Sequence, residues 1–131
     1  MAKLTDAQRA FVRDNPFYAV VTTLREDGSP HSTVVWVDEE DGEILFNTAY
    51  PRVKPRELEH DPRASVAVVD PADGYRWIAV SGPATLTTDG ANDDIDRLSR
   101  KYTGADYQWH REGETRVTVR LRPERITAYG I

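Results

Sequence analysis

The feature that most constrains the fold is a series of short segments in which β-branched and aromatic residues recur with a period of two. Residues 17–24 form the first segment, residues 30–38 the second and residues 43–48 the third. Asp27-Gly28 and Asp41-Gly42 lie between them, and each dipeptide is a hairpin signal because glycine readily adopts a positive φ. The spacing predicts three antiparallel strands connected as a meander.

The remainder of the chain continues this pattern. Residues 115–121 alternate cleanly, so Arg116 and Thr118 are expected to face solvent. Strands are predicted over residues 64–69, 75–88, 115–121 and 126–129. The second of these should bend near Gly82-Pro83, because proline cannot donate to a central ladder and glycine marks a bend or a close approach of backbone.

Three segments carry helical signals instead. Thr5 and Gln8 match a capping box at the start of a helix that Asn15-Pro16 ends. Residues 51–62 predict a short helix, and residues 92–102 predict one with acids in its first turns and bases in its last turn. Six or seven mostly antiparallel strands with small helices most simply close into a β-barrel, because closure removes exposed edges.

Length and composition indicate a single domain over residues 1–131. Hydrophobic residues make up 39% and charged residues 30%, as in ordinary globular proteins. The chain has no cysteine, which excludes disulfides, thiolate metal sites and a cysteine nucleophile and is compatible with a reducing cytoplasm. The net charge of -5 disfavours a general nucleic-acid binder. No apolar run approaches the ~18 residues of a membrane helix, and no signal peptide is visible, so a cytoplasmic protein is expected.

Motifs for self-contained catalysis are missing from the sequence. It holds no Gly-x-Gly, no phosphate-binding Gly-Lys-Ser/Thr loop, no Gly-x-Ser-x-Gly and no His-Glu-x-x-His. His31, His60 and His110 are scattered along the chain, and no metal site is predicted. If the protein is an enzyme, a bound cofactor should supply the reactive group.

The strongest candidate for ligand binding is a basic segment at the end of the third predicted strand. Asn47 and Thr48 lie at the strand end, and Arg52, Lys54 and Arg56 follow within the start of a short helix. Free backbone N–H groups at a helix N-terminus, together with three cations, could clamp a phosphate or a carboxylate-rich ligand. Acidic residues follow immediately, so an ordinary charged helix face explains the residues equally well.

Aromatic residues form a second candidate. Tyr75 and Trp77 lie on one face of a predicted strand, where they could wall a flat ring or pack in a core or a dimer interface. Trp36 alternates with two valines and is expected in the core or in an interface.

Polar side chains of the second predicted strand form a third candidate. His31, Ser32 and Thr33 follow the first hairpin directly. A histidine there is more often a surface residue than a catalytic one, and His31 is the one weak catalytic candidate.

These segments together resemble the pyridoxamine 5′-phosphate oxidase-like split β-barrel family, and within it the group that uses the deazaflavin coenzyme F420. The resemblance covers about residues 4–130 and rests on the order and spacing of several short motifs. These are Asp27-Gly28-Ser29-Pro30, the run 42–48, Pro51-Arg52-x-Lys54-x-Arg56-x-Leu58, the run 61–65, Gly74-Tyr75-Arg76-Trp77 and Gly82-Pro83-Ala84.

The resemblance implies a homodimer with two cofactor sites at the subunit interface. It implies that Asn47, Thr48, Arg52 and Lys54 hold the phosphate side of the cofactor, with Arg56 adding charge for an acidic tail. His31, Ser32 and Thr33 would lie near the ring, and Tyr75 and Trp77 would approach it from the partner subunit.

The implied activity is that of an oxidoreductase in which reduced F420 gives a hydride to a small conjugated or aromatic acceptor. An FMN-dependent oxidoreductase is the alternative within the same fold. A non-catalytic carrier of F420 or FMN, or a dimeric barrel without a redox cofactor, also fits the residues.

Overall fold

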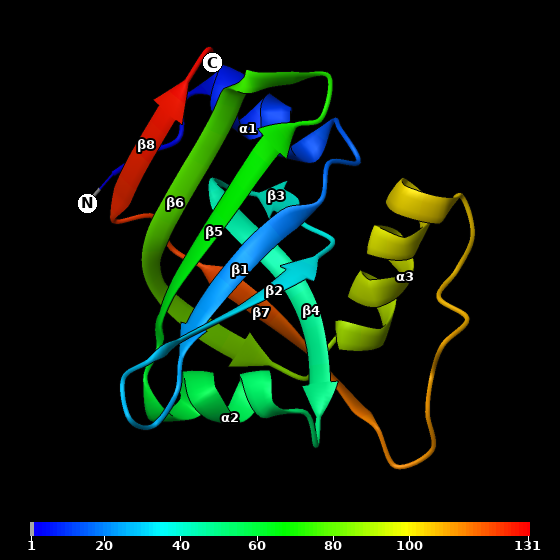
Figure 1. The fold of residues 1–131 in the computed structure, drawn as a ribbon. Helices are drawn as coiled ribbons and strands as arrows, with labels where there is room; N and C mark the ends of the chain where they lie inside the picture. The colour runs from blue at the N-terminus through cyan, green and yellow to red at the C-terminus, as the bar shows by residue number, and fades with distance from the viewer. Residues whose placement is uncertain (1) are drawn as a thin grey trace.

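The computed structural model describes residues 2–131, which form eight strands and three helices (Figure 1). The strands are β1 (Ala19–Leu24), β2 (Pro30–Val35), β3 (Asp38–Glu40), β4 (Glu43–Tyr50), β5 (Arg63–Asp70), β6 (Asp73–Thr87), β7 (Thr115–Leu121) and β8 (Arg125–Tyr129). The helices are α1 (Asp6–Arg13), α2 (Val53–His60) and α3 (Ala91–Thr103). The predicted class, a mainly β fold with small helices, is confirmed.

The strand count differs from the prediction at one place. Residues 30–38 were expected to form a single strand, but the chain leaves the ladder after Val35 and begins β3 at Asp38. β2 pairs with β1, whereas β3 pairs with β4, so the two halves of this segment belong to different parts of the sheet. An uninterrupted apolar run, residues 34–37, continues through the break, and for this reason the sequence alone did not reveal it.

The sheet runs in the order β2-β1-β5-β6-β7-β4-β3, and all neighbours are antiparallel. The long strand β6 joins the two halves: its first part pairs with β5 and β8, and its last residues pair with β7. β2 and β3 are the two ends of this order, and within residues 2–131 no ladder connects them. The barrel is therefore split along this side.

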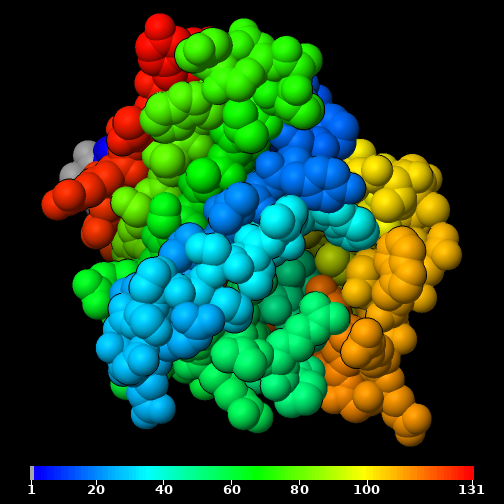
Figure 2. Space-filling model, viewed as in Figure 1, coloured from blue at the N-terminus to red at the C-terminus, as the bar shows by residue number. Residues whose placement is uncertain are grey.

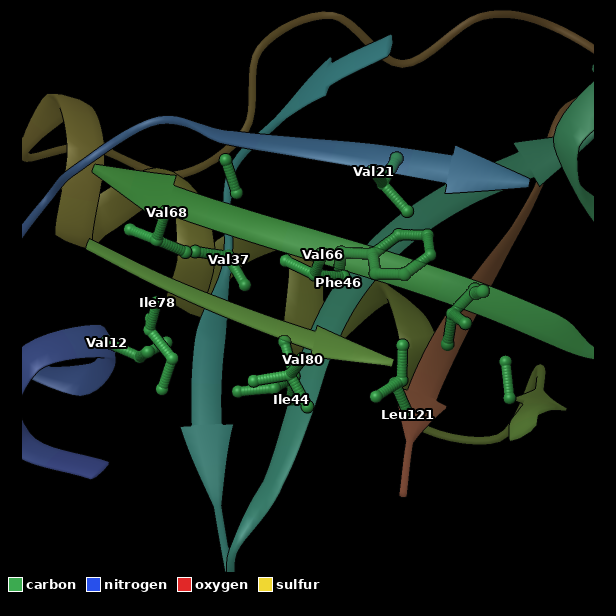
Figure 3. Close-up of a cluster of buried hydrophobic side chains, with 14 of the residues drawn as sticks. Val12, Val21, Val37, Ile44, Phe46, Val66, Val68, Ile78, Val80 and Leu121 are labelled. Carbon is green, nitrogen blue, oxygen red and sulfur yellow. The ribbon is translucent and has the colours of Figure 1, made fainter. Parts of the chain in front are cut away.

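The core fills the space between the two halves. Phe46 on β4, Val66 on β5, Val80 on β6 and Leu121 on β7 point into the same interior and are at most 1% exposed (Figure 3). Burying four such side chains contributes on the order of 1.5–3 kcal/mol each to folding. This shared interior holds the strand ends, and hence the side chains on them, in fixed positions.

Helix α1 closes one end of the barrel as its sequence predicted. The Thr5 side chain accepts a hydrogen bond from the Gln8 amide at 3.1 Å, and the Gln8 side chain accepts one from the Thr5 amide at 3.0 Å. This capping box directs the helix so that Phe11 and Val12 are buried.

Helix α3 covers the outer side of β4 and β7, and its position corrects one expectation. The alternation of β7 predicted that Arg116 and Thr118 face solvent, but they are only 5% and 2% exposed. Ile95 and Leu98 of α3 are buried as well. A strand covered on both faces no longer separates inside from outside by its period, and polar residues on it must find partners instead.

The bend of β6 depends on Gly82, where a Cβ atom would lie 1.9 Å from the Arg122 carbonyl oxygen. Gly82→Ala must therefore displace backbone, and we expect it to lower the free energy of unfolding by at least about 2 kcal/mol. Gly74→Ala is the matched control, because a Cβ atom there has nothing within 4 Å. Urea denaturation measures both variants, and equal stabilities for the two would contradict the close approach.

Candidate functional site

A cavity of about 440 Å³ lies on the split side of the barrel, between the end of β2, the end of β4 and helix α3. Figure 2 shows a hollow between β2, the start of α2 and the segment that precedes β7. Its walls combine aromatic, aliphatic and cationic side chains. They are Tyr18, Val34, Val35, Trp36, Asn47, Thr48, Arg52, Lys54, Ile95, Leu98, Tyr107, Trp109 and Arg116.

Four residues of the basic segment line this cavity together. Asn47 and Thr48 lie in the second half of β4, Arg52 is the N-cap residue of α2, and Lys54 is in its first turn. The Arg52 side chain makes no capping hydrogen bond to the helix, and α2 begins at the cavity wall. Both the helix dipole and the two side-chain charges therefore favour an anionic group at this end of the cavity.

Lys54 is a partly desolvated cation. Burial and the nearby Arg52 charge lower the pKa of its ammonium group below the ordinary value. Its Nζ atom lies 6.0 Å from the centre of the Phe46 ring. A cation placed against the apolar core beside another cation gains more from an anionic ligand than a fully hydrated one does.

Arg116 forms the most deeply buried charge of the site. Its Nε donates to Asn47 Oδ1 at 2.9 Å and its Nη1 to Glu114 Oε1 at 3.1 Å. The guanidinium carbon also lies 4.9 Å from the centre of the Tyr107 ring. The network aligns Asn47, whose Nδ2 donates to the Ala91 carbonyl of α3 at 2.9 Å.

An aromatic wall, formed by Trp36, Tyr107 and Trp109, lines the same cavity as the cations. Trp36 stacks on Tyr102 with ring centres 5.5 Å apart, and it contacts Tyr107 and Trp109 edge-on at 6.3 and 6.4 Å. Tyr107 and Trp109 contact each other at 5.6 Å. The sequence predicted only a core or interface position for Trp36 and gave no role to Tyr107, Trp109 or Arg116. An aromatic-rich loop before a predicted strand was the one available signal.

Tyr102 anchors this wall to the barrel. Its hydroxyl donates to the Phe17 carbonyl at 2.5 Å and accepts from the Val37 amide at 3.1 Å. Burial raises the pKa of this phenol to about 12, so the group stays protonated and keeps donating.

His31 and Arg56 line a different hollow, of about 610 Å³, on the other side of α2. His31 Nδ1 lies 2.7 Å from Glu57 Oε1, which also accepts a hydrogen bond from Thr23 at 3.0 Å. The chain therefore does not bring these two predicted residues to the cavity that holds Arg52 and Lys54.

The remaining predicted residues also lie outside the cavity. Ser32 faces outward and shares a hydrogen bond with Thr22 at 2.9 Å, whereas the Thr33 hydroxyl is buried and has no partner within residues 2–131. Tyr75 and Trp77 lie on the same face of β6, which is the outer face of the sheet, and Tyr75 is 78% exposed. Their expected role in a partner's site stays a prediction.

Within residues 2–131, no group of three or more His, Cys, Asp or Glu side chains could hold a metal ion. None of the helices in the described part of the chain has the length and apolarity to cross a membrane.

Comparison with known proteins identifies the family. The family model described as pyridoxamine 5′-phosphate oxidase matches residues 4–130, nearly the entire chain. The chain belongs to the pyridoxamine 5′-phosphate oxidase family. The resemblance inferred from the motifs is thus confirmed.

Individual known proteins resemble the chain over nearly its full length. It is 28% identical over 126 residues to the F420H(2)-dependent biliverdin reductase of Mycobacterium tuberculosis (strain CDC 1551 / Oshkosh). The aligned residues make up 95% of this chain and 87% of that protein. A solved structure of an F420 reductase superposes with a TM-score of 0.80 at 24% identity, covering 90% of this chain and 94% of that one. The crystal structure of a conserved hypothetical protein from Mycobacterium tuberculosis superposes with a TM-score of 0.77 at 24% sequence identity. The match covers 96% of this chain and 84% of that one. The two structures establish the shared fold.

The lowered pKa of Lys54 predicts an effect on stability. Below that pKa the folded state carries an ammonium group that the unfolded chain hydrates better, and stability rises as the pH passes from the lowered pKa to the ordinary 10.5. Lys54→Met should therefore raise the free energy of unfolding at pH 7, and this gain should vanish above pH 10.5. Urea titrations at both pH values test it, with the exposed Lys3→Met as control. A Lys54→Met protein that is less stable at pH 7 would refute the assignment.

Proposed function

We propose that this protein is an F420-dependent oxidoreductase that transfers a hydride from reduced F420 to a small conjugated or aromatic acceptor. The observation that carries the proposal is a single cavity whose lining combines the cations Arg52 and Lys54 with an aromatic wall. The biliverdin reductase relative, whose name specifies reduced F420, supports the choice of cofactor.

The residues of the cavity fit such a cofactor. F420 joins a tricyclic deazaflavin ring to an anionic tail that contains a phosphate. Arg52 and Lys54, with the N-terminus of α2, would hold the phosphate, and Asn47 and Thr48 are polar groups beside it. A volume of about 440 Å³ is within the ordinary range for small-ligand sites.

The chain's own residues would position the ring and exclude water. When bound, F420 supplies the hydride, and no protein nucleophile is needed. Trp36 and Tyr107 offer flat apolar surface, and the network of Arg116 and Asn47 holds the floor of the cavity rigid. Fixing the distance between donor and acceptor is the main catalytic contribution that such a site can make.

The aromatic wall of the cavity also indicates the class of acceptor. Trp109 is 55% exposed at the cavity mouth and can stack with a planar acceptor that enters from solvent. We propose quinones, nitroaromatics and tetrapyrroles as the compounds to test first. The relative that reduces biliverdin supports including tetrapyrroles.

We also propose that the protein is a homodimer. Val34, Val20, Ala67 and Ala79 are cross-strand neighbours that form one uncharged row across β2, β1, β5 and β6, on the outer face of the sheet. Val20 is 43% exposed and Val34 67%. Because Val34 also lines the cavity, a second copy seated on this row would close the open side of the site.

FMN is the alternative cofactor, because resemblance to the pyridoxamine 5′-phosphate oxidase-like family implies FMN or F420, and the cations fit the phosphate of either one. A carrier that binds either cofactor without turnover is distinguished by single-turnover assays with the reduced cofactor.

Titration of the purified protein with F420 and with FMN tests the cofactor assignment. F420 should bind, and Lys54→Met should weaken its binding at least about tenfold, since a charge-assisted hydrogen bond contributes about 1.5–3 kcal/mol. Fluorescence of the deazaflavin measures the dissociation constant, and Lys3→Met should leave it unchanged. If FMN binds tightly and F420 does not bind, the cofactor is FMN and the F420 assignment is wrong. If neither binds, the proposed function is wrong.

Sedimentation equilibrium tests the dimer. The wild-type protein should sediment at twice the 14.8 kDa chain mass, and Val20→Glu should shift it to the single-chain mass by burying a charge in the interface. Val53→Glu is the control, because Val53 is 59% exposed on α2, away from this row. A monomeric wild-type protein would contradict the proposal.

A further inference from the structure

Glu114 places a carboxylate against two arginines, Arg52 and Arg116, that line the cavity. It directly precedes β7, and its side chain is 6% exposed. Its oxygens lie 3.1 Å from Arg116 Nη1, 3.7 Å from Arg52 Nη2 and 3.7 Å from His110 Nδ1. One buried anion therefore faces three cationic or protonatable side chains.

The two arginines differ in how firmly they hold this carboxylate. The Arg116 side chain is 4% exposed and depends on Glu114 and Asn47 for compensation of its charge. The Arg52 side chain is 48% exposed, and its 3.7 Å contact with Glu114 is a loose ion pair. Ion pairs of this kind contribute little and exchange easily. Arg52 is thus the partner that Glu114 can release.

We propose that Glu114 is an internal competitor for the anionic end of the ligand. In the free protein its carboxylate pairs with Arg52, and a phosphate entering the cavity takes over that guanidinium. This inference rests on the proposed function, because it assumes that the cavity binds an anion through Arg52. Since coupling is reciprocal, the bound phosphate in turn loosens Glu114 and the aromatic segment that leads to it, including Trp109.

The opposite role for Glu114 makes the opposite prediction. If the carboxylate served to orient Arg52 for the ligand, its neutralisation would weaken binding of the phosphate. If it competes, neutralisation strengthens binding. The sign of the change in affinity separates the two roles.

Glu114→Gln is the test variant, because glutamine keeps the size of the side chain and an oxygen that can accept from Arg116. Glu112→Gln is the matched control, an exposed residue of the same loop with the same change in net charge. We expect Glu114→Gln to lower the dissociation constant of F420 about two- to fivefold. The same deazaflavin without its phosphate-bearing tail should bind both variants and wild type equally.

A double-mutant cycle with Arg52→Gln tests whether Glu114 acts through Arg52. In the Arg52→Gln background, Glu114→Gln should no longer change the dissociation constant of F420. Circular dichroism and the midpoint of urea denaturation verify that each variant folds. If Glu114→Gln does not fold, Glu114→Asp replaces it, because the shorter side chain withdraws the carboxylate from Arg52 by one methylene.

Unchanged or weaker F420 binding by Glu114→Gln overturns the inference, as does a gain that Glu112→Gln reproduces. If the wild-type protein binds neither F420 nor FMN, the proposed function is wrong. In that case, calorimetry with inorganic pyrophosphate tests the inference separately. Tighter pyrophosphate binding by Glu114→Gln than by the wild-type protein supports the inference, and equal or weaker binding overturns it.

Discussion

The side chain of Arg116 carries a positive charge into the interior between the sheet and α3, and its surroundings compensate for that charge. An unpaired buried ion costs several kcal/mol, so Asn47, Glu114 and the Tyr107 ring are held where they can contact the guanidinium. These contacts connect β4, β7 and the loop before β7. The floor and one wall of the cavity therefore follow from the need to compensate one buried cation.

Local patterns predicted most of the fold and part of the site. Hairpin dipeptides and the capping box act between neighbours in the chain. The strands, apart from the break between β2 and β3, and helix α1 formed as expected. The group of Asn47, Thr48, Arg52 and Lys54 was also found, because a strand end and a helix start deliver them to one place. Arg116 was missed because its burial depends on how α3 packs over β4 and β7, and the alternation within β7 does not show that packing.

The split of the barrel determines where the cavity lies and which residues line it. Within one chain, the cations and the aromatic wall meet at the open side, while Tyr75, Trp77 and His31 lie elsewhere. The proposed homodimer through the outer sheet face would close that side and complete the enclosure of a bound cofactor. Membership of the pyridoxamine 5′-phosphate oxidase family and the F420-dependent relative are consistent with this arrangement.

A crystal structure of the protein with bound F420 tests the account most directly. It should show the phosphate within hydrogen-bonding distance of both Arg52 and Lys54, and the deazaflavin ring against Trp36 and Tyr107. A complex in which these cations point to bulk solvent, with the phosphate or the ring seated elsewhere, would contradict the account.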